Sequence, residues 1–416
     1  MNISAGGKDQ PCACVHSDTS GREDSLTPPG KSCCHGSVTR LRAKVLFVSY
    51  TTDVVGPTNS LLLLLRHLGC LYDVSVLLPG PGVFSEELTR NDIPFFTLPS
   101  MSKWSIPAIY RLIKKEHFDL VYGNNTSSCS RNTFIAAKLA GVPFICHVRG
   151  MGWRKSWLQL GFLKFADSTI AVSEACAKSI SRFSSREKLH VVRNGVDISA
   201  PEADHNSARD YLLSQTGLQP QNVVVISVAH VCSRKGQEHA IRAIAETLEK
   251  APSVHLLLVG SLDRDAAYVH KIRLMIKEKG LDQQVSIIGF RRDIPQLLRG
   301  SDVFIHTAMA DPHPRSVIEA MEASLPVVAF SVDGVAESVV DGVTGYRVPK
   351  GDISEMSSAV LKLATDRSLR VQLGRNGRSH VEENFTAEAT AQRIRNIIDG
   401  VLDSYEQRRK RHTVKF

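Results

Sequence analysis

The chain has 416 residues, of which 43% are hydrophobic and 22% are charged, and its formal net charge is +9. This length exceeds one ordinary hydrophobic core and predicts two domains of nearly 200 residues each. No run of 18 apolar residues is present, which argues against a membrane-spanning helix. The first residues also lack the apolar segment of a signal peptide, so we expect a cytoplasmic protein.

The positive charge favours anionic partners such as nucleotide phosphates, lipid head groups or nucleic acid. Five basic side chains lie in the tail 408–416: Arg408, Arg409, Lys410, Arg411 and Lys415. For this tail, a solvated end and a peripheral contact with the cytoplasmic face of a membrane both remain open. No nucleic-acid recognition module accompanies the charge, so nucleic acid is not an expected partner.

Residues 1–42 lack apolar periodicity and are rich in Gly, Ser, Pro and Asp, which predicts a disordered N-terminal extension. Four of the nine cysteines lie in it, with a spacing that matches no standard zinc finger: Cys12, Cys14, Cys33 and Cys34. The other five, which lie in predicted elements, are interpreted as free thiols of a reducing compartment.

From residue 43 onward, short apolar strands alternate with helical patterns, which is typical of parallel sheets covered by helices on both faces. The first doubly wound domain is predicted to span 43–199. It begins with the strand K-V-L-F-V-S-Y, a turn that contains Gly56 and a helix over Ser60–Leu68. A polar stretch with two prolines, 200–221, is interpreted as a linker. A second domain of the same kind is predicted over 222–386, followed by a helix over 387–407.

Polar clusters follow several strands of the first domain, at the sheet edge where such folds bind ligands. They include Asn124–Ser127, His147–Arg149, Ser173–Ala175 and Arg193–Asp197. A histidine at a strand end has either a structural role or a binding role, and the residues alone leave both open.

The segment from Ala310 to Glu322, A-D-P-H-P-R-S-V-I-E-A-M-E, combines two carboxylates with a helix start. Prolines keep its first half out of a helix interior, so Asp311 is expected in a loop and Glu319 in the first turn of the helix that follows. A helix start offers free N–H groups that suit a diphosphate, and carboxylates accept hydrogen bonds from sugar hydroxyls. Ser316 and Glu319 also have the spacing of a capping box, which would be purely structural.

The longer stretch 306–337, H-T-A-M-A-D-P-H-P-R-S-V-I-E-A-M-E-A-S-L-P-V-V-A-F-S-V-D-G-V-A-E, resembles the donor-site signature of retaining GT-B glycosyltransferases of family 4, the glycosyl transferases group 1 type. The segments F-I-C-H-V-R-G, A-V-S-E-A and V-R-N-G-V-D resemble other signatures of that family. The resemblance covers about 43–400. It implies two Rossmann-like domains that face each other across a cleft, with the acceptor on the first domain and the donor mainly on the second.

The resemblance also implies roles for individual residues. Lys235 would hold the departing diphosphate, His147 would face the donor sugar, Asp311 would bind sugar hydroxyls and Glu319 the ribose. These four are the expected catalytic residues. The expected donor site comprises Gly56, His230, Arg234, Lys235, Arg292, Asp311, Pro314, Arg315, Ser316, Val317 and Glu319.

Three positions depart from the family pattern. Pro57 stands in place of a second glycine, and Asp311 stands in place of a glutamate that is one methylene longer. His230 stands in place of an arginine that would help to neutralise the diphosphate. Either a protonated His230 or Arg234 would have to replace that arginine, and both alternatives stay open.

The implied reaction is transfer of a sugar from a UDP-, GDP- or ADP-sugar to a hydroxyl of a glycan, a lipid-linked sugar or a small metabolite, with retention of configuration. No cofactor and no metal are expected, because fixed cations would stabilise the leaving group. Asp263 and Asp265 form a D-x-D pair that we interpret as a polar loop before a helix. Two alternatives remain: a catalytically degenerate partner protein that binds nucleotide sugars, and a GT-B-fold sugar-nucleotide epimerase.

Overall fold

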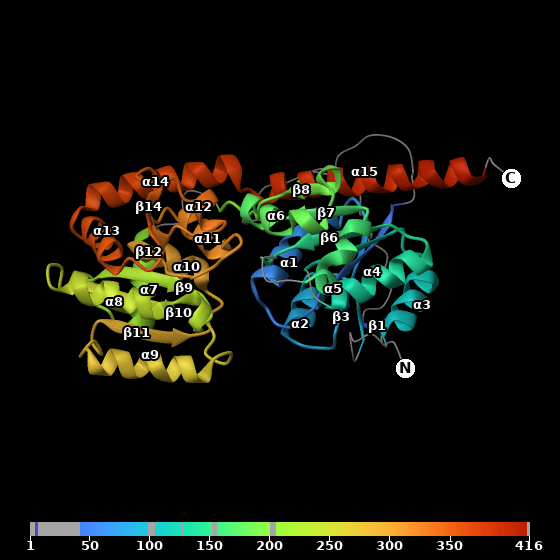
Figure 1. Ribbon diagram of the computed structural model, residues 1–416. Coiled ribbons are helices and arrows are strands. Elements are labelled where there is room, and N and C mark those ends of the chain that lie inside the picture. The colour runs from blue at the N-terminus through green and yellow to red at the C-terminus, as the bar shows by residue number, and fades with distance from the viewer. Residues whose placement is uncertain are drawn as a thin grey trace, which may run out of the picture.

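The computed structural model describes residues 5–6, 42–98, 105–125, 128–151, 156–199 and 205–413. These residues form two α/β domains that lie side by side, and the last helix, α15 (Ala387–Thr413), runs from the second domain along the first (Figure 1). The fold is thus the expected pair of Rossmann-like parallel-sheet domains.

The first domain is built on a sheet with the strand order β1-β4-β3-β2-β5-β6-β7-β8. Seven strands are parallel to one another: β2 (Lys44–Val48), β3 (Asp73–Leu78), β4 (Phe95–Thr97), β5 (Leu120–Gly123), β6 (Phe144–Val148), β7 (Ser168–Ala171) and β8 (Leu189–Val191). The apolar runs of β2, β5, β6 and β7 are buried on both faces, as parallel sheets require, whereas β4 and β8 are partly exposed.

Two helical layers cover this sheet. One face packs against α1 (Gly56–Leu68), α2 (Val83–Arg90) and α15. The other face packs against α3 (Ile106–Glu116), α4 (Ser128–Ala140), α5 (Trp157–Leu160) and α6 (Glu174–Ile180).

Two residues of the extension expected to be disordered, Ala5–Gly6, form β1, a short edge strand antiparallel to β4. The rest of 1–41, including its four cysteines, lies outside the described residues. The five described cysteines are free thiols.

The second domain has a six-stranded sheet with the order β11-β10-β9-β12-β13-β14, and all its strands are parallel. The strands are β9 (Val223–Val228), β10 (Val254–Val259), β11 (Val285–Gly289), β12 (Val303–His306), β13 (Val327–Phe330) and β14 (Gly345–Val348). The helices are α7 (His205–Thr216), α8 (Gln237–Leu248), α9 (Ala266–Glu278), α10 (Ile294–Arg299), α11 (Arg315–Glu322), α12 (Val335–Ser338), α13 (Ile353–Thr365) and α14 (Arg367–Asn384).

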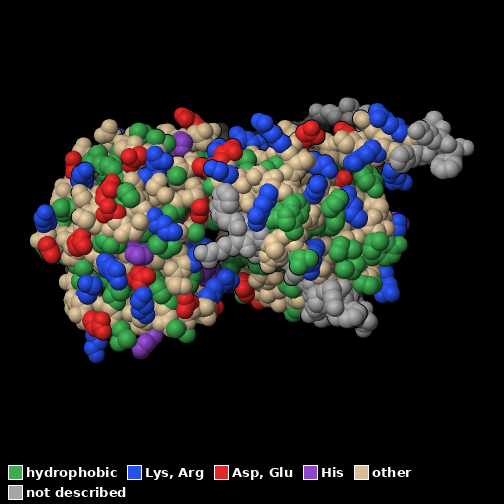
Figure 2. Space-filling model, in the orientation of Figure 1, with side chains coloured by type: hydrophobic (Ala, Val, Ile, Leu, Met, Phe, Trp, Pro, Cys, Tyr) green, Lys and Arg blue, Asp and Glu red, His purple; other side chains and the backbone are tan. Residues whose placement is uncertain are grey.

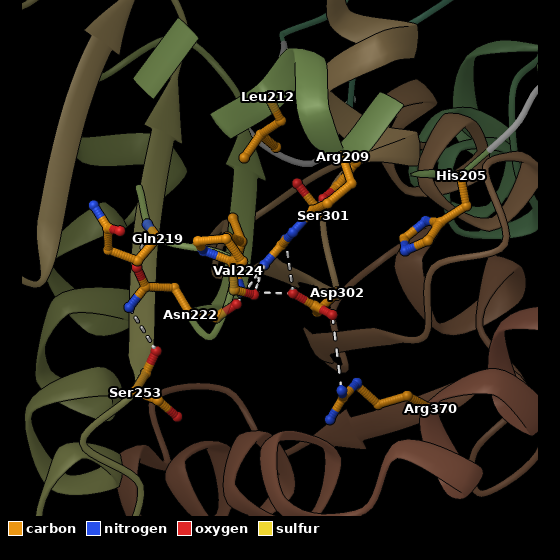
Figure 3. Close-up of polar contacts among 12 residues, drawn as sticks. His205, Arg209, Leu212, Gln219, Asn222, Val224, Ser253, Ser301, Asp302 and Arg370 are labelled. Atoms are coloured by element: carbon orange, nitrogen blue, oxygen red, sulfur yellow. Dashed lines mark hydrogen bonds and ion pairs between the residues drawn. The ribbon is translucent and has the colours of Figure 1, made fainter. Parts of the chain in front are cut away.

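The stretch interpreted as a linker contains helix α7, which belongs to the second domain. Leu212 of α7 is fully buried in the core of that domain. The guanidinium of Arg209 donates to Asp302 Oδ2 (3.1 Å), and Arg370 lies 3.7 Å from the same carboxylate (Figure 3). The polar composition of this stretch therefore reflects a largely exposed helix that is tied to the domain by one ion-pair cluster.

Two other helices differ from the expected bounds. Helix α1 begins at Gly56 and not at Ser60, because Pro57 is tolerated in a first turn whose N–H groups have no intrahelical partner. Helix α15 continues to Thr413, so Arg408–Arg411 of the expected basic tail are helical. Helix α14 did not stand out in the sequence.

Candidate active site in the cleft between the domains

A cavity of about 740 Å³ lies between the two domains. Its second-domain wall is formed by the carboxyl ends of β9 and β10 and by the residues that follow β11. Its first-domain wall includes the start of α1 at Gly56 and Asn59. Four of the predicted donor-site residues line it: Gly56, His230, Arg292 and Glu319. Ligands of doubly wound sheets bind at this edge.

Asp311 and Lys235 do not line this cavity, but they form a buried ion pair near His230, which does. Lys235 Nζ lies 2.5 Å from Asp311 Oδ2, and His306 Nε2 of β12 lies 3.6 Å from the same oxygen. Burial on its own would raise the pKa of Asp311, but Lys235 and His306 hold that pKa well below its usual range. Asp333 accepts a hydrogen bond from the Asp311 N–H (3.1 Å) and fixes the loop. Asp311 is therefore an ionised, immobilised acceptor.

Helix α11 begins at Arg315, directly after Pro314, and no side chain caps its first turn. The capping-box alternative is not formed, because Ser316 is the second residue of the helix and not its N-cap. Glu319 is the fifth residue, just past the first turn in which it was expected, and it is bound by Arg315 (Nη2–Oε1 3.0 Å). Ser316 and Val317 are the second and third residues, so their backbone N–H groups belong to the unpaired first turn. The helix start is available to an anion.

Of the two side chains considered as replacements for the arginine, neither is a buried cation. Burial, with Arg264 and Lys235 nearby, lowers the pKa of His230, so this imidazole is neutral at neutral pH. Arg234 is exposed, and its Nη1 lies 3.5 Å from the carbonyl oxygen of Ala310. Arg234 is thus the one of the two that is charged.

The loop after β11 offers an aromatic ring and a guanidinium to the cavity. Phe290 is a partly exposed large apolar side chain, and Arg292 is exposed. The neighbouring Arg291 is bound to Asp293 (2.5 Å) and so is directed to this carboxylate. Phe290 and Arg292 can therefore contact a flat, polar ring.

His147 does not line this cavity. It lies on β6 beneath α1 and α15, and its Nδ1 is 2.6 Å from the hydroxyl of Tyr122. Arg149 Nη2 also donates to Nδ1 (3.3 Å), so the proton of the neutral ring is on Nε2, which has no partner among the described residues. Burial, with a contribution from Arg149, lowers the pKa of His147 well below its usual value.

Two residues after His147, Arg149 extends past the end of β6 towards the second domain. Its guanidinium donates to two neutral acceptors, Asn124 Oδ1 (2.5 Å) and Asn194 Oδ1 (2.7 Å), and Asn194 in turn donates to the carbonyl of His313 in the second domain (2.9 Å). Burial lowers the pKa of Arg149 to about 10. Its place after a strand was the one sequence signal for this residue.

Glu337 of α12 connects the domains a second time. Its carboxylate accepts from the backbone N–H groups of Glu174 (3.0 Å) and Ala175 (2.9 Å) at the start of α6, and it pairs with Arg193 (3.2 Å). A carboxylate at the N-terminal end of a helix is electrostatically favourable. The cleft is therefore held by polar contacts whose partners lie in different domains.

Asp265, one half of the D-x-D pair, caps helix α9 by accepting from the N–H of Tyr268. Among the described residues, no three His, Cys, Asp or Glu side chains are grouped as metal ligands. No helix within the described part of the chain is both long and apolar enough to cross a membrane.

The two parallel-sheet Rossmann-like domains, with a cavity between them, have the architecture of a GT-B glycosyltransferase. The model of the family "Glycosyl transferases group 1" matches residues 209–380, and that of "Glycosyltransferase Family 4" matches residues 55–200. The chain belongs to glycosyltransferase family 4 in the group 1 type, as the sequence resemblance indicated.

Characterised relatives agree with this assignment. The chain is 25% identical over 362 residues to the UDP-Gal:alpha-D-GlcNAc-diphosphoundecaprenol alpha-1,3-galactosyltransferase of Escherichia coli, with 80% of this chain and 90% of that protein covered. It is 26% identical over 247 residues to the capsular polysaccharide biosynthesis glycosyltransferase CapM of Staphylococcus aureus, with 58% and 63% covered.

Among solved structures, HepE of Anabaena in complex with UDP and glucose superimposes with a TM-score of 0.77 at 26% sequence identity. The match covers 86% of this chain and all of that chain. WaaG, a glycosyltransferase involved in lipopolysaccharide biosynthesis, has the same fold with a TM-score of 0.65 at 16% identity and with coverage of 86% and 100%. The protein is therefore a glycosyltransferase whose relatives include enzymes that bind UDP-sugars.

Proposed function

We propose that the protein transfers a hexose from a UDP-sugar to a hydroxyl of a glycan or lipid-linked acceptor, with retention of configuration. The observation that carries this proposal is the arrangement at the cleft: Lys235 and the uncapped start of α11 lie beside a 740 Å³ cavity whose wall includes Glu319. This cavity suits a nucleotide, and the helix start with its neighbouring ammonium suits a diphosphate.

In this proposal the nucleoside diphosphate is the leaving group of the reaction. As the bond between the sugar and the diphosphate breaks, negative charge develops on the phosphate oxygens. The Lys235 ammonium and the N–H groups of Ser316 and Val317 stabilise that charge. The charged Arg234 adds to the positive potential from the same side of the cleft, since His230 is neutral. Arg149 supplies a further guanidinium from the first domain.

The two carboxylates have separate tasks. Asp311 is fixed by Lys235 and by the hydrogen bond from its N–H to Asp333, and an ionised carboxylate has lone pairs left to accept hydrogen bonds from sugar hydroxyls. Glu319 faces the cavity and accepts from the ribose hydroxyls, with Arg315 keeping its carboxylate oriented. Phe290 and Arg292 contact the base.

The donor nucleotide and acceptor class are supported by relatives. HepE, 26% identical, binds UDP and glucose, and the Escherichia coli relative uses a UDP-sugar and an acceptor linked to diphosphoundecaprenol. A lipid-linked acceptor would also agree with the positive net charge, because such an acceptor resides at a membrane surface.

The test is turnover of UDP-hexoses with a glycan and a lipid-linked acceptor, followed by NMR of the anomeric proton in the product. We expect product only when acceptor is present, with the same anomeric configuration as the donor sugar. Inverted product would contradict retention. Conversion of the sugar nucleotide without acceptor would favour the epimerase alternative, and donor binding without turnover would favour the degenerate partner protein.

A further inference from the structure

Five large apolar side chains of the first domain are exposed to solvent on α4, α5 and the 3₁₀ turn η2 (Gly161–Phe165). The exposed fractions are 83% for Leu158, 66% for Leu139, 65% for Phe165, 55% for Trp157 and 36% for Ile135. We call these five residues the apolar patch. Figure 2 shows apolar side chains gathered on this half of the molecule, over α4 and its neighbours. Isolated apolar side chains on a surface are ordinary, whereas a group of this size requires an explanation.

Contacts join the elements that carry the apolar patch. Ile135 and Leu139 are four residues apart on α4, so they lie on one helix face. Arg131, one turn earlier on that face, donates to the carbonyl oxygen of Leu158 (3.0 Å) and so joins α5 to α4. Trp157 packs edge-to-face on the ring of Phe183, with ring centroids 5.0 Å apart.

The basic end of α15 lies beside the same elements. Asp167, two residues after Phe165, is bound both by Lys138 of α4 (2.7 Å) and by Arg408 of α15 (3.3 Å). The hydroxyl of Tyr405 donates to the carbonyl oxygen of Gly141, directly after α4. These contacts place the basic residues that follow on α15 at the edge of the apolar patch: Arg409, Lys410 and Arg411.

The charge around the apolar patch is therefore positive. Four cations contact its elements: Arg131, Lys138, Arg182, which lies over the Phe183 ring at 4.5 Å, and Arg408. The acidic side chain in these contacts is Asp167, and two of the four cations share it. Tryptophan, phenylalanine and leucine next to Lys and Arg match the boundary between head groups and acyl chains of an anionic bilayer.

We propose that the apolar patch and the basic end of α15 dock the first domain onto an anionic phospholipid surface. The apolar side chains enter the head-group boundary, while Lys and Arg contact lipid phosphates. A second copy of this chain, whose formal net charge is +9, would bring further positive charge to the basic rim, whereas an anionic bilayer supplies both phosphates and an apolar layer. The docking rests on the proposed function, because it would bring the cleft to a lipid-linked acceptor. Vesicle binding itself is measured without any transfer reaction.

Vesicle sedimentation tests this docking. Full-length protein is mixed with vesicles of phosphatidylglycerol and phosphatidylcholine in equal parts, or of phosphatidylcholine alone. We expect binding to the anionic vesicles that weakens as salt is raised. The double variant Leu139→Glu/Leu158→Glu should bind these vesicles with an affinity at least roughly tenfold lower than that of the wild type. The variant Lys410→Glu/Arg411→Glu should lose affinity for the anionic vesicles in particular.

The control is Leu274→Glu/Val343→Glu, which places the same charges at two other exposed apolar side chains (44% and 46%), both on the second domain. This control should sediment like the wild type. Equal binding by wild type and both patch variants, or no binding of the wild type to anionic vesicles, would overturn the proposal. A dimer of the wild type that the patch variants abolish, without any vesicle binding, would assign the patch to a second copy and would also overturn it. UDP binding by the same variants is measured in parallel, so that a failure of vesicle docking can be distinguished from a failure of the proposed function.

Discussion

The ammonium of Lys235 lies 2.5 Å from the carboxylate of Asp311, in a site where both side chains are largely buried. The pair neutralises Lys235 when no diphosphate is bound and holds Asp311 in place for a sugar hydroxyl. This makes the two charges mutually dependent, because either one alone would be left without a partner away from water.

Removal of the ammonium should therefore destabilise the protein. Lys235→Ala is expected to lower the free energy of unfolding by about 3–5 kcal/mol, as for other broken buried ion pairs. Lys235→Ala/Asp311→Asn should recover most of this loss in urea unfolding but should recover no transfer activity. If the single and double variants were equally stable, Asp311 would not depend on Lys235.

Loss of the Glu319 carboxylate should weaken donor binding. Because Glu319 lines the cavity and is held in place by Arg315, Glu319→Gln is expected to raise the KM for the donor by roughly tenfold to hundredfold. Steady-state kinetics at saturating acceptor measure this change. Glu278→Gln, on exposed α9, is the matched control. An unchanged KM would place the ribose elsewhere.

Acid should destabilise the protein through buried neutral histidines. Burial, together with the nearby Arg193, lowers the pKa of His313 to about 3, so between pH 3 and about 6.5 the unfolded chain binds a proton that the folded chain does not. Stability therefore rises with pH across this window and levels off above it. His313→Phe should reduce the slope by one proton, about 1.4 kcal/mol per pH unit. Urea unfolding at a series of pH values measures the slope, and an unchanged slope would contradict this assignment.

The Glu337 contacts should hold the cleft closed. Glu337→Ala removes the carboxylate that binds the start of α6 and Arg193, so we expect a larger radius of gyration in small-angle X-ray scattering and a lower kcat. UDP affinity should be unchanged, because Glu337 does not line the cavity. Glu355→Ala on α13 is the control. An unchanged radius and kcat would mean that other contacts suffice.

Transfer should proceed without a divalent metal, since Lys235 and the α11 start carry the proposed stabilisation of the diphosphate. Protein treated with EDTA and then assayed in metal-free buffer is expected to keep its kcat within about twofold, a change of under 1 kcal/mol in activation free energy. Loss of activity on EDTA treatment, with restoration by Mg²⁺ or Mn²⁺, would contradict this expectation.

Much of the fold could be predicted because buried parallel strands and amphipathic helices leave periodic patterns. The expected first strand K-V-L-F-V-S-Y contains β2 (Lys44–Val48), and the helix expected from residue 387 begins there as α15. Helix α7 was interpreted as a linker, because Ala208 and Leu212 are its only buried side chains among mostly polar residues. Helix α14 is similarly polar over most of its surface. Such helices are held by ion pairs whose partners are distant in the sequence.

A candidate site residue could be proposed from the sequence where one motif contains both that residue and its structural neighbours. Asp311, Glu319 and the helix start between them are contiguous in the sequence, and of these residues Glu319 lines the cavity. Arg149 and Glu337 could not be found in this way, because their partners, such as Asn194 and the start of α6, come from other elements. The side chain of His147 lies on the sheet face that α1 covers, so it lies beneath that helix and does not line the cavity.

The central claim is that the donor is held at the start of α11 by Lys235 and Glu319. Calorimetric titration of UDP into the wild type, Lys235→Ala/Asp311→Asn and Glu319→Gln tests it most directly, with Lys277→Ala on exposed α9 as the control. We expect UDP to bind the wild type and the control equally, and to bind both site variants at least roughly tenfold more weakly. Equal UDP affinity in all four proteins, or no binding by the wild type, would contradict the account.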